Sequence, residues 1–109
     1  MASDKLGEEL EGFNAEYRRS LPERLREIEA LWSELRRGEV SRERMHALVR
    51  ALHSIAGSGA TFGMPSVSAA AAAAEAWVEP CYERGALPGE SRRGELDVLL
   101  TALRQAASS

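Results

Sequence analysis

The chain has 109 residues and a formal net charge of −3, which fits one domain. Its 44% hydrophobic and 28% charged residues are typical of a globular protein, and the acidic balance argues against a general nucleic-acid binder. Cys81 is the only cysteine, which excludes an intrachain disulfide and favours a cytoplasmic location. The first ten residues lack the pattern of a signal peptide, and the most apolar stretch, residues 69–78, is shorter than the roughly 20 residues that cross a bilayer. We therefore expect neither a nucleic-acid nor a membrane partner.

Apolar residues at three- and four-residue spacing predict a first helical segment over about residues 4–19. Its apolar stripe consists of Leu6, Leu10, Phe13 and Tyr17. Ser20, Pro22 and Glu23 then resemble a helix start, with Ser20 as the cap, and a second stripe continues until Gly38. The pattern leaves open whether these are two helices or one helix kinked near Pro22.

The next predicted helix begins with Ser41 as its cap and ends near Gly63. Its apolar face consists of Met45, Leu48, Val49, Leu52 and Ile55. Pro65 suits the first turn of a following helix. That helix contains an alanine run, residues 69–74, which favours helix formation and the close approach of a neighbouring helix.

Residues 85–89 include two glycines and a proline and predict a loop. A last helix follows, with Ser91 as a possible cap, and its tail from residue 106 is expected to fray. No alternating strand pattern or hairpin turn occurs in the sequence. We therefore predict an all-α fold, an antiparallel four-helix bundle with an additional N-terminal helix or helix extension, forming a single domain over residues 1–109.

His53 falls at the edge of the apolar stripe of its predicted helix. With Leu52 at the centre of that stripe, His53 lies about 100° away around the helix. Ala56 and Gly57 follow one turn later and Ala60 two turns later, so the surroundings are small. We infer an imidazole that is packed on one side and accessible to another protein on the other. A neutral imidazole offers a nucleophilic nitrogen near physiological pH, and phosphoryl transfer mainly requires positioning and charge stabilisation.

Residues 53–63 resemble the motif of histidine-containing phosphotransfer (HPt) domains. That motif reads His, any residue, Leu or Ile, Lys, Gly, Ser or Ala, then small or apolar residues to a Gly. The matching residues are His53, Ile55, Gly57, Ser58, Phe62 and Gly63. The resemblance covers most of the chain, since the predicted helices look like the family's successive helices. It implies a carrier phosphorylated on His53, and the sequence contains no Gly-rich nucleotide-binding loop with which to make the phosphoryl group itself.

The resemblance also implies partners and supporting residues. The partners would be the receiver domain of a response regulator and a hybrid sensor kinase; the chain would bind no cofactor, and any Mg²⁺ would belong to the partner. Gly57 would leave room for the phosphoryl group, and Gly63 would end the helix in a left-handed conformation. Glu75 lies where several family members carry an acidic residue. Its carboxylate could hydrogen-bond the inner nitrogen of His53, or Glu75 could be a solvated helix residue.

One departure concerns the lysine that the family usually carries three residues after the histidine. Ala56 occupies that position here. Arg50, one turn before His53, could reach the same face and supply the missing charge. His46 lies two turns before His53, about 10.5 Å along the helix axis, which is too far for both to bind one metal ion. We therefore predict no metal site, and His46 could contact the partner instead.

Three functions agree with these observations to different extents. The first is a phosphorelay carrier, which the motif favours. The second is an HPt-like docking module without phosphotransfer, which the missing lysine motivates. The third is an unrelated helical adaptor, against which His53, Gly57 and Gly63 argue. We expect a monomer; the sequence does not identify the cognate kinase or regulator, or whether the chain is a piece of a larger sensor.

Overall fold

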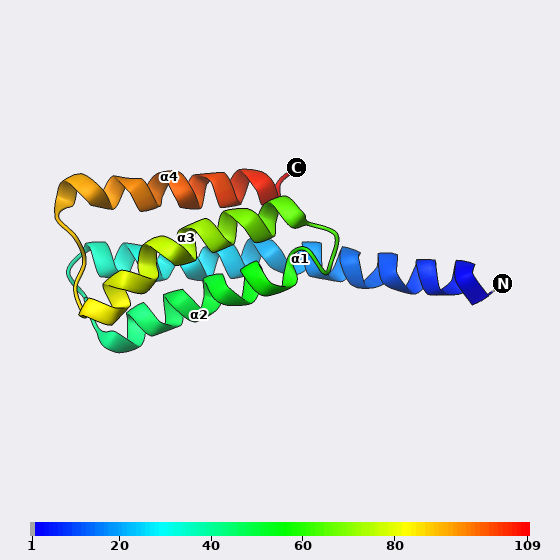
Figure 1. The fold of residues 1–109 in the computed structure, drawn as a ribbon, viewed down its shortest axis with the longest axis horizontal. Coiled ribbons are helices and arrows are strands. Elements are labelled where there is room, and N and C mark those ends of the chain that lie inside the picture. The colour runs from blue at the N-terminus through cyan, green and yellow to red at the C-terminus, as the bar shows by residue number, and fades with distance from the viewer. Residues whose placement is uncertain (1) are drawn as a thin grey trace.

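The computed structural model describes residues 2–109, and within them the chain forms four α-helices and no strand (Figure 1). The helices are α1 (Ala2–Arg36), α2 (Arg42–Ser58), α3 (Pro65–Arg84) and α4 (Glu90–Ala107). Both α1 and α3 pack against α2 and α4. Because short loops join consecutive helices, neighbouring helices run antiparallel. The predicted all-α fold and four-helix bundle are confirmed.

Pro22 lies inside α1, which is one continuous helix (Figure 1). The predicted cap at Ser20 is therefore wrong, and the Ser20 hydroxyl instead donates to the carbonyl of Tyr17 at 2.6 Å. Proline has no N–H to donate within the helix, which costs stability. The buried side chains of Leu21 and Leu25, on either side of Pro22, hold this part of α1 against the bundle and offset that cost.

The additional N-terminal element is an extension of α1. This helix has 35 residues, about 52 Å at 1.5 Å per residue, whereas the others have 17 to 20. Its N-terminal part extends well beyond the end of the bundle (Figure 1). The apolar residues Leu6, Leu10 and Phe13 on this part are 57%, 54% and 56% exposed. The predicted stripe is therefore present but is covered only from Tyr17 onward.

The core is built from periodic apolar side chains of all four helices. Burying each such side chain contributes roughly 1.5–3 kcal/mol to folding, so these residues fix how the helices face one another. The large side chains that are fully buried are Leu21, Ile28, Leu35, Met45, Leu48, Leu52, Ile55, Val67, Val78, Cys81, Leu96 and Leu103.

The ends of α4 differ from the prediction. The helix begins one residue before Ser91, which is therefore not its cap. The Arg93 side chain donates from Nε to the carbonyl of Pro88 at 2.9 Å and fastens the first turn to the preceding loop. At the other end, Ala106 and Ala107 are helical and pack against the core, so the expected fraying is wrong for these two residues; the regular helix ends at Ala107.

Asp97 joins α4 to α1. It accepts a hydrogen bond from the indole Nε1 of Trp32 at 2.8 Å and forms an ion pair with Arg36. The Arg36 guanidinium also lies over the Trp32 ring, 5.5 Å from its centroid. The hydrogen bond from Trp32, together with the positive charge of Arg36, lowers the pKa of the Asp97 carboxyl group.

Asp97 is therefore expected to make stability depend on pH in the acid range. A lowered pKa in the folded state means that its contribution is present above the ordinary aspartate pKa, about 3.9, and is lost as the pH falls through the folded value. Urea unfolding of the native chain and of Asp97→Asn should differ at pH 6, with the native chain more stable. The difference should shrink below about pH 4; an equal difference at both pH values would contradict this assignment.

Cys81 is buried in α3 and is 2% exposed. Burial raises the pKa of its thiol, because the thiolate would lose its hydration, and the positive charges of Arg84 and Arg92 only partly oppose this. We expect an aromatic disulfide reagent to modify Cys81 about 100-fold or more slowly in the native chain than in urea. Rapid modification without denaturant would contradict the burial of this side chain.

Candidate functional site

His53 lies on α2, at the border between its core-facing stripe and solvent. Its neighbours Leu52 and Ile55 are fully buried and fix the orientation of this part of the helix. The His53 side chain is itself 74% exposed. A rigid, packed helix therefore presents an imidazole that another protein can reach.

Glu75 on α3 contacts the imidazole directly. Its Oε2 lies 2.8 Å from Nδ1 of His53, and its side chain is only 17% exposed. An ionised carboxylate only accepts hydrogen bonds, so in a contact with ionised Glu75 the donor is Nδ1 of His53. In the neutral ring of that tautomer the lone pair is on Nε2, on the other side of the ring. The arrangement orients the imidazole and selects the tautomer whose outer nitrogen is nucleophilic.

Small side chains allow α3 to place Glu75 this close to α2. Ala71 and Ala74, before Glu75, are fully buried, and short side chains at a contact let two helices pack closely. Nearer the start of α3, the Ser68 hydroxyl donates to the backbone carbonyl of Ala56. The alanine run is thus part of the reason that the His53–Glu75 hydrogen bond can form.

Gly57 and Gly59 have different surroundings. A Cβ on Gly59 would lie 2.9 Å from the backbone nitrogen of Ser68 and 3.1 Å from each of two backbone oxygens. A Cβ on Gly57 would meet nothing within 4 Å. Packing between α2 and α3 therefore requires glycine at position 59, which the sequence analysis missed. Nothing inside the described chain requires it at position 57, beside His53.

The other small residues predicted near His53 place no bulky side chain beside the imidazole. Ala60 is exposed in the turn after α2, and Ala56 is half-buried against the core. Ala72, one turn before Glu75 on α3, is also exposed. The structure thus leaves an uncluttered surface around the imidazole and no cation at position 56.

Two arginines lie on the α1 side of His53. Arg50, the predicted substitute for the usual lysine, is exposed and lines a groove between α1 and α2. Arg24 on α1 lines the same groove, and its Nη2 donates to Oγ of Ser54 at 2.6 Å. Arg24 and Ser54 are 30 positions apart in the chain, so no helical periodicity could have identified this contact.

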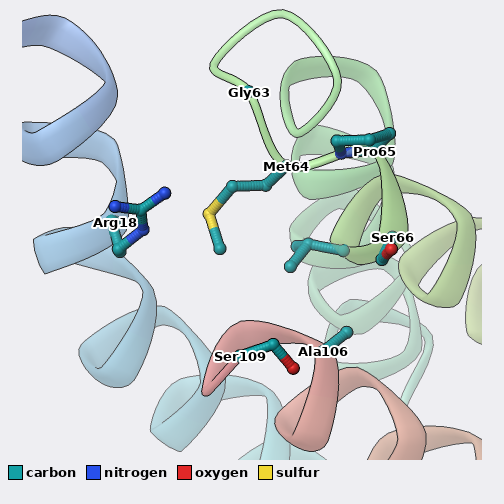
Figure 2. A pocket seen from close by; sticks show the side chains of 8 residues that line it. Arg18, Gly63, Met64, Pro65, Ser66, Ala106 and Ser109 are labelled. Atoms are coloured by element: carbon teal, nitrogen blue, oxygen red, sulfur yellow. The ribbon is translucent and has the colours of Figure 1, made fainter. Parts of the chain in front are cut away.

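Gly63 closes the helical turn after α2, although the regular helix ends at Ser58. Its φ is +80°, and the amide of Met64 donates to the carbonyl of Gly59 at 2.8 Å, as in a Schellman motif. The predicted left-handed conformation is confirmed, and the predicted end of the regular helix near Gly63 is wrong by several residues. Gly63 also lines a hollow at this end of the bundle, where α1, the start of α3 and the C-terminal end of the chain after α4 come together (Figure 2). Its other lining residues are Arg18, Met64, Pro65, Ser66, Val67, Ala106 and Ser109.

His46 stacks on the Tyr82 ring of α3, with centroids 5.3 Å apart. The Arg42 guanidinium also lies over the Tyr82 ring, with Cζ 4.8 Å from the ring centroid. Within residues 2–109 no three His, Cys, Asp or Glu side chains gather as metal ligands would. In the same residues, no helix combines the length and apolar character needed to cross a membrane.

The sequence matches the Hpt domain family over residues 14–108, which includes His53, Glu75 and all of the bundle except the α1 extension and the last residue. No curated protein and no solved structure gave a significant match. Hpt domains are helical bundles that carry phosphoryl groups on histidine in phosphorelays and interact with receiver domains. Since the match covers most of the sequence, the chain belongs to the Hpt domain family.

Proposed function

We propose that this chain carries a phosphoryl group on Nε2 of His53 between the receiver-domain aspartates of two-component proteins. The observation that carries the proposal is the hydrogen bond between Nδ1 of His53 and the Glu75 carboxylate at 2.8 Å. It holds an exposed imidazole in the tautomer that an in-line nucleophile needs. The partners are the receiver domains of a hybrid sensor kinase and of a response regulator. The chain acts as a monomer in the cytoplasm.

In the proposed step, the Nε2 lone pair of His53 attacks the phosphorus of an aspartyl phosphate. A P–N bond forms, the P–O bond to the aspartyl carboxylate breaks, and that carboxylate leaves with the electron pair. The ring keeps its Nδ1 proton and becomes positively charged, and the Glu75 carboxylate balances this charge. Transfer to the next aspartate is the reverse reaction. The chain itself needs no cofactor, and any Mg²⁺ belongs to the partner.

Arg50 stands in for the usual lysine in this proposal. It lies three residues before His53, and side chains at this spacing on a helix are neighbours, with Cβ atoms about 5–6 Å apart. A long, flexible side chain at this position can reach the oxygens of a phosphoryl group on Nε2. Arg50 then supplies positive charge that Ala56 cannot.

The test is transfer from a panel of phosphorylated receiver domains to the native chain and to His53→Gln. The proposal expects an acid-labile, base-stable label on the native chain and none on the variant, since phosphohistidine has this stability pattern. A label that persists in His53→Gln would contradict the assignment of His53. Transfer to neither chain would contradict the carrier function.

A docking module without phosphotransfer is the second candidate, and the absence of a cation at position 56 favours it. It predicts that receiver domains bind the native chain and His53→Gln equally and that neither becomes labelled. The same panel separates the two functions when binding is measured beside labelling.

A further inference from the structure

Arg24 is a cation on α1 whose head group is held against α2 at Ser54, next to His53. Its Nη2 donates to the hydroxyl of Ser54 at 2.6 Å, and Ser54 directly follows His53. Its guanidinium also lies over the ring of Tyr17, with Cζ 5.5 Å from the ring centroid. Contacts to two helices restrict the position of this head group. A restricted side chain loses less conformational entropy when it binds something else.

The groove that contains Arg24 has a net positive charge, because two arginines and one glutamate line it. It lies between α1 and α2 and is lined by Arg24, Glu27, Ala47, Arg50, Ala51 and Ser54. In the described part of the chain, no carboxylate oxygen lies within 4.0 Å of a side-chain nitrogen of Arg24 or Arg50, although other arginines do form ion pairs. Both guanidinium groups can therefore bind acidic groups from outside the chain.

The Arg24 head group lies to one side of the imidazole that would carry the phosphoryl group. Ser54 lies about 100° further around α2 than His53, on the α1 side, whereas the imidazole is turned toward Glu75 on α3. A group fixed to Ser54 thus flanks the reacting nitrogen and does not cover it. Arg24 is suited to contact a protein that sits over His53.

We propose that Arg24 binds a carboxylate on the surface of the receiver domain and so positions this partner over His53, while Arg50 faces the phosphoryl group. This inference rests on the proposed function and adds a positioning role for Arg24. The groove holds two arginines and one carboxylate, Glu27, so its net charge is positive and complements an acidic protein surface. Ser54 and Tyr17 keep Arg24 in the orientation that this contact needs.

The test uses the full chain and a receiver domain, phosphorylated with acetyl phosphate, that transfers to the native chain. Arg24→Gln should raise the KM, here the receiver concentration that gives half the maximal single-turnover rate, about two- to fivefold, the range for one exposed ion pair. The maximal single-turnover rate should stay unchanged. The difference should shrink as salt is added, because salt screens exposed charges. Arg24→Lys, which keeps the charge, should recover most of the affinity. Arg26→Gln is the matched control, since Arg26 is exposed on α1 but pairs with Glu23, and it should leave the KM unchanged.

A small phosphoryl donor separates docking from chemistry. Phosphoramidate should label His53 at the same rate in the native chain and in Arg24→Gln, because no protein has to dock. An unchanged KM in Arg24→Gln, or a loss that is independent of salt, would overturn the inference while leaving the carrier function intact. If no receiver domain binds or transfers to the native chain, both proposals are wrong.

Discussion

Replacing Glu75 with glutamine is expected to slow phosphoryl transfer through His53 by about 10- to 100-fold. A hydrogen bond to a charged group is worth roughly 1.5–3 kcal/mol, which corresponds to this range. The glutamine amide can also donate to Nδ1 of His53, which favours the tautomer with its proton on Nε2, the attacking atom. It carries no negative charge to balance the phosphorylated ring. Single-turnover transfer from a phosphorylated receiver domain measures the effect.

Glu79→Gln is the matched control for this prediction. Glu79 lies one turn further along α3, is exposed, and forms no ion pair in the described chain, so its variant should transfer at the native rate. Nitrogen NMR of the imidazole gives a second measurement: the native ring should be protonated on Nδ1, and the Glu75→Gln ring should be a mixture of tautomers. A native transfer rate in Glu75→Gln would show that the hydrogen bond does not support the reaction.

Gly59→Ala is expected to destabilise the fold by about 1–3 kcal/mol, the usual cost of overpacking. The new methyl group would press on the backbone of Ser68, and backbone atoms cannot turn away as a flexible side chain does. In a bundle of this size, each 1 kcal/mol corresponds to a change of roughly 4–8 °C in Tm. Thermal unfolding followed by circular dichroism measures the change.

Gly57→Ala tests the same substitution two positions earlier, where the added methyl group meets nothing. Alanine favours the helix over glycine, so this variant should be as stable as the native chain or more stable by up to about 1 kcal/mol. Equal stability of the two alanine variants would contradict the close α2–α3 contact at Gly59. The pair thus distinguishes a glycine needed for folding from one beside the proposed site.

The sequence could predict the helices because each buries a periodic stripe, and periodicity is local. It could not decide between one helix and two at Pro22, because Ser20 and Glu23 imitate a helix start while the buried residues Leu21 and Leu25 continue the stripe. Burial decides such a case, and burial depends on the other helices.

The candidate site was predictable to the extent that the family motif covers it. His53 stands within that motif, and the hydrogen bond to Glu75 was expected only through the resemblance, since the two residues are 22 positions apart. Gly59 and Arg24 were missed because their contacts, to Ser68 and Ser54, join different helices. No spacing within one helix encodes a contact of that kind.

The extension of α1 has a consequence for how that helix forms. An isolated helix of about a dozen residues is marginal in water, and the extension contains Gly7 and Gly12, which weaken it further. Its helical structure therefore grows outward from the turns that the bundle already holds, so that it needs no nucleus of its own. Amide protons should exchange progressively faster from Tyr17 toward the N-terminus. Raising the temperature should therefore shorten the helical part of this extension while the bundle that carries His53 stays folded.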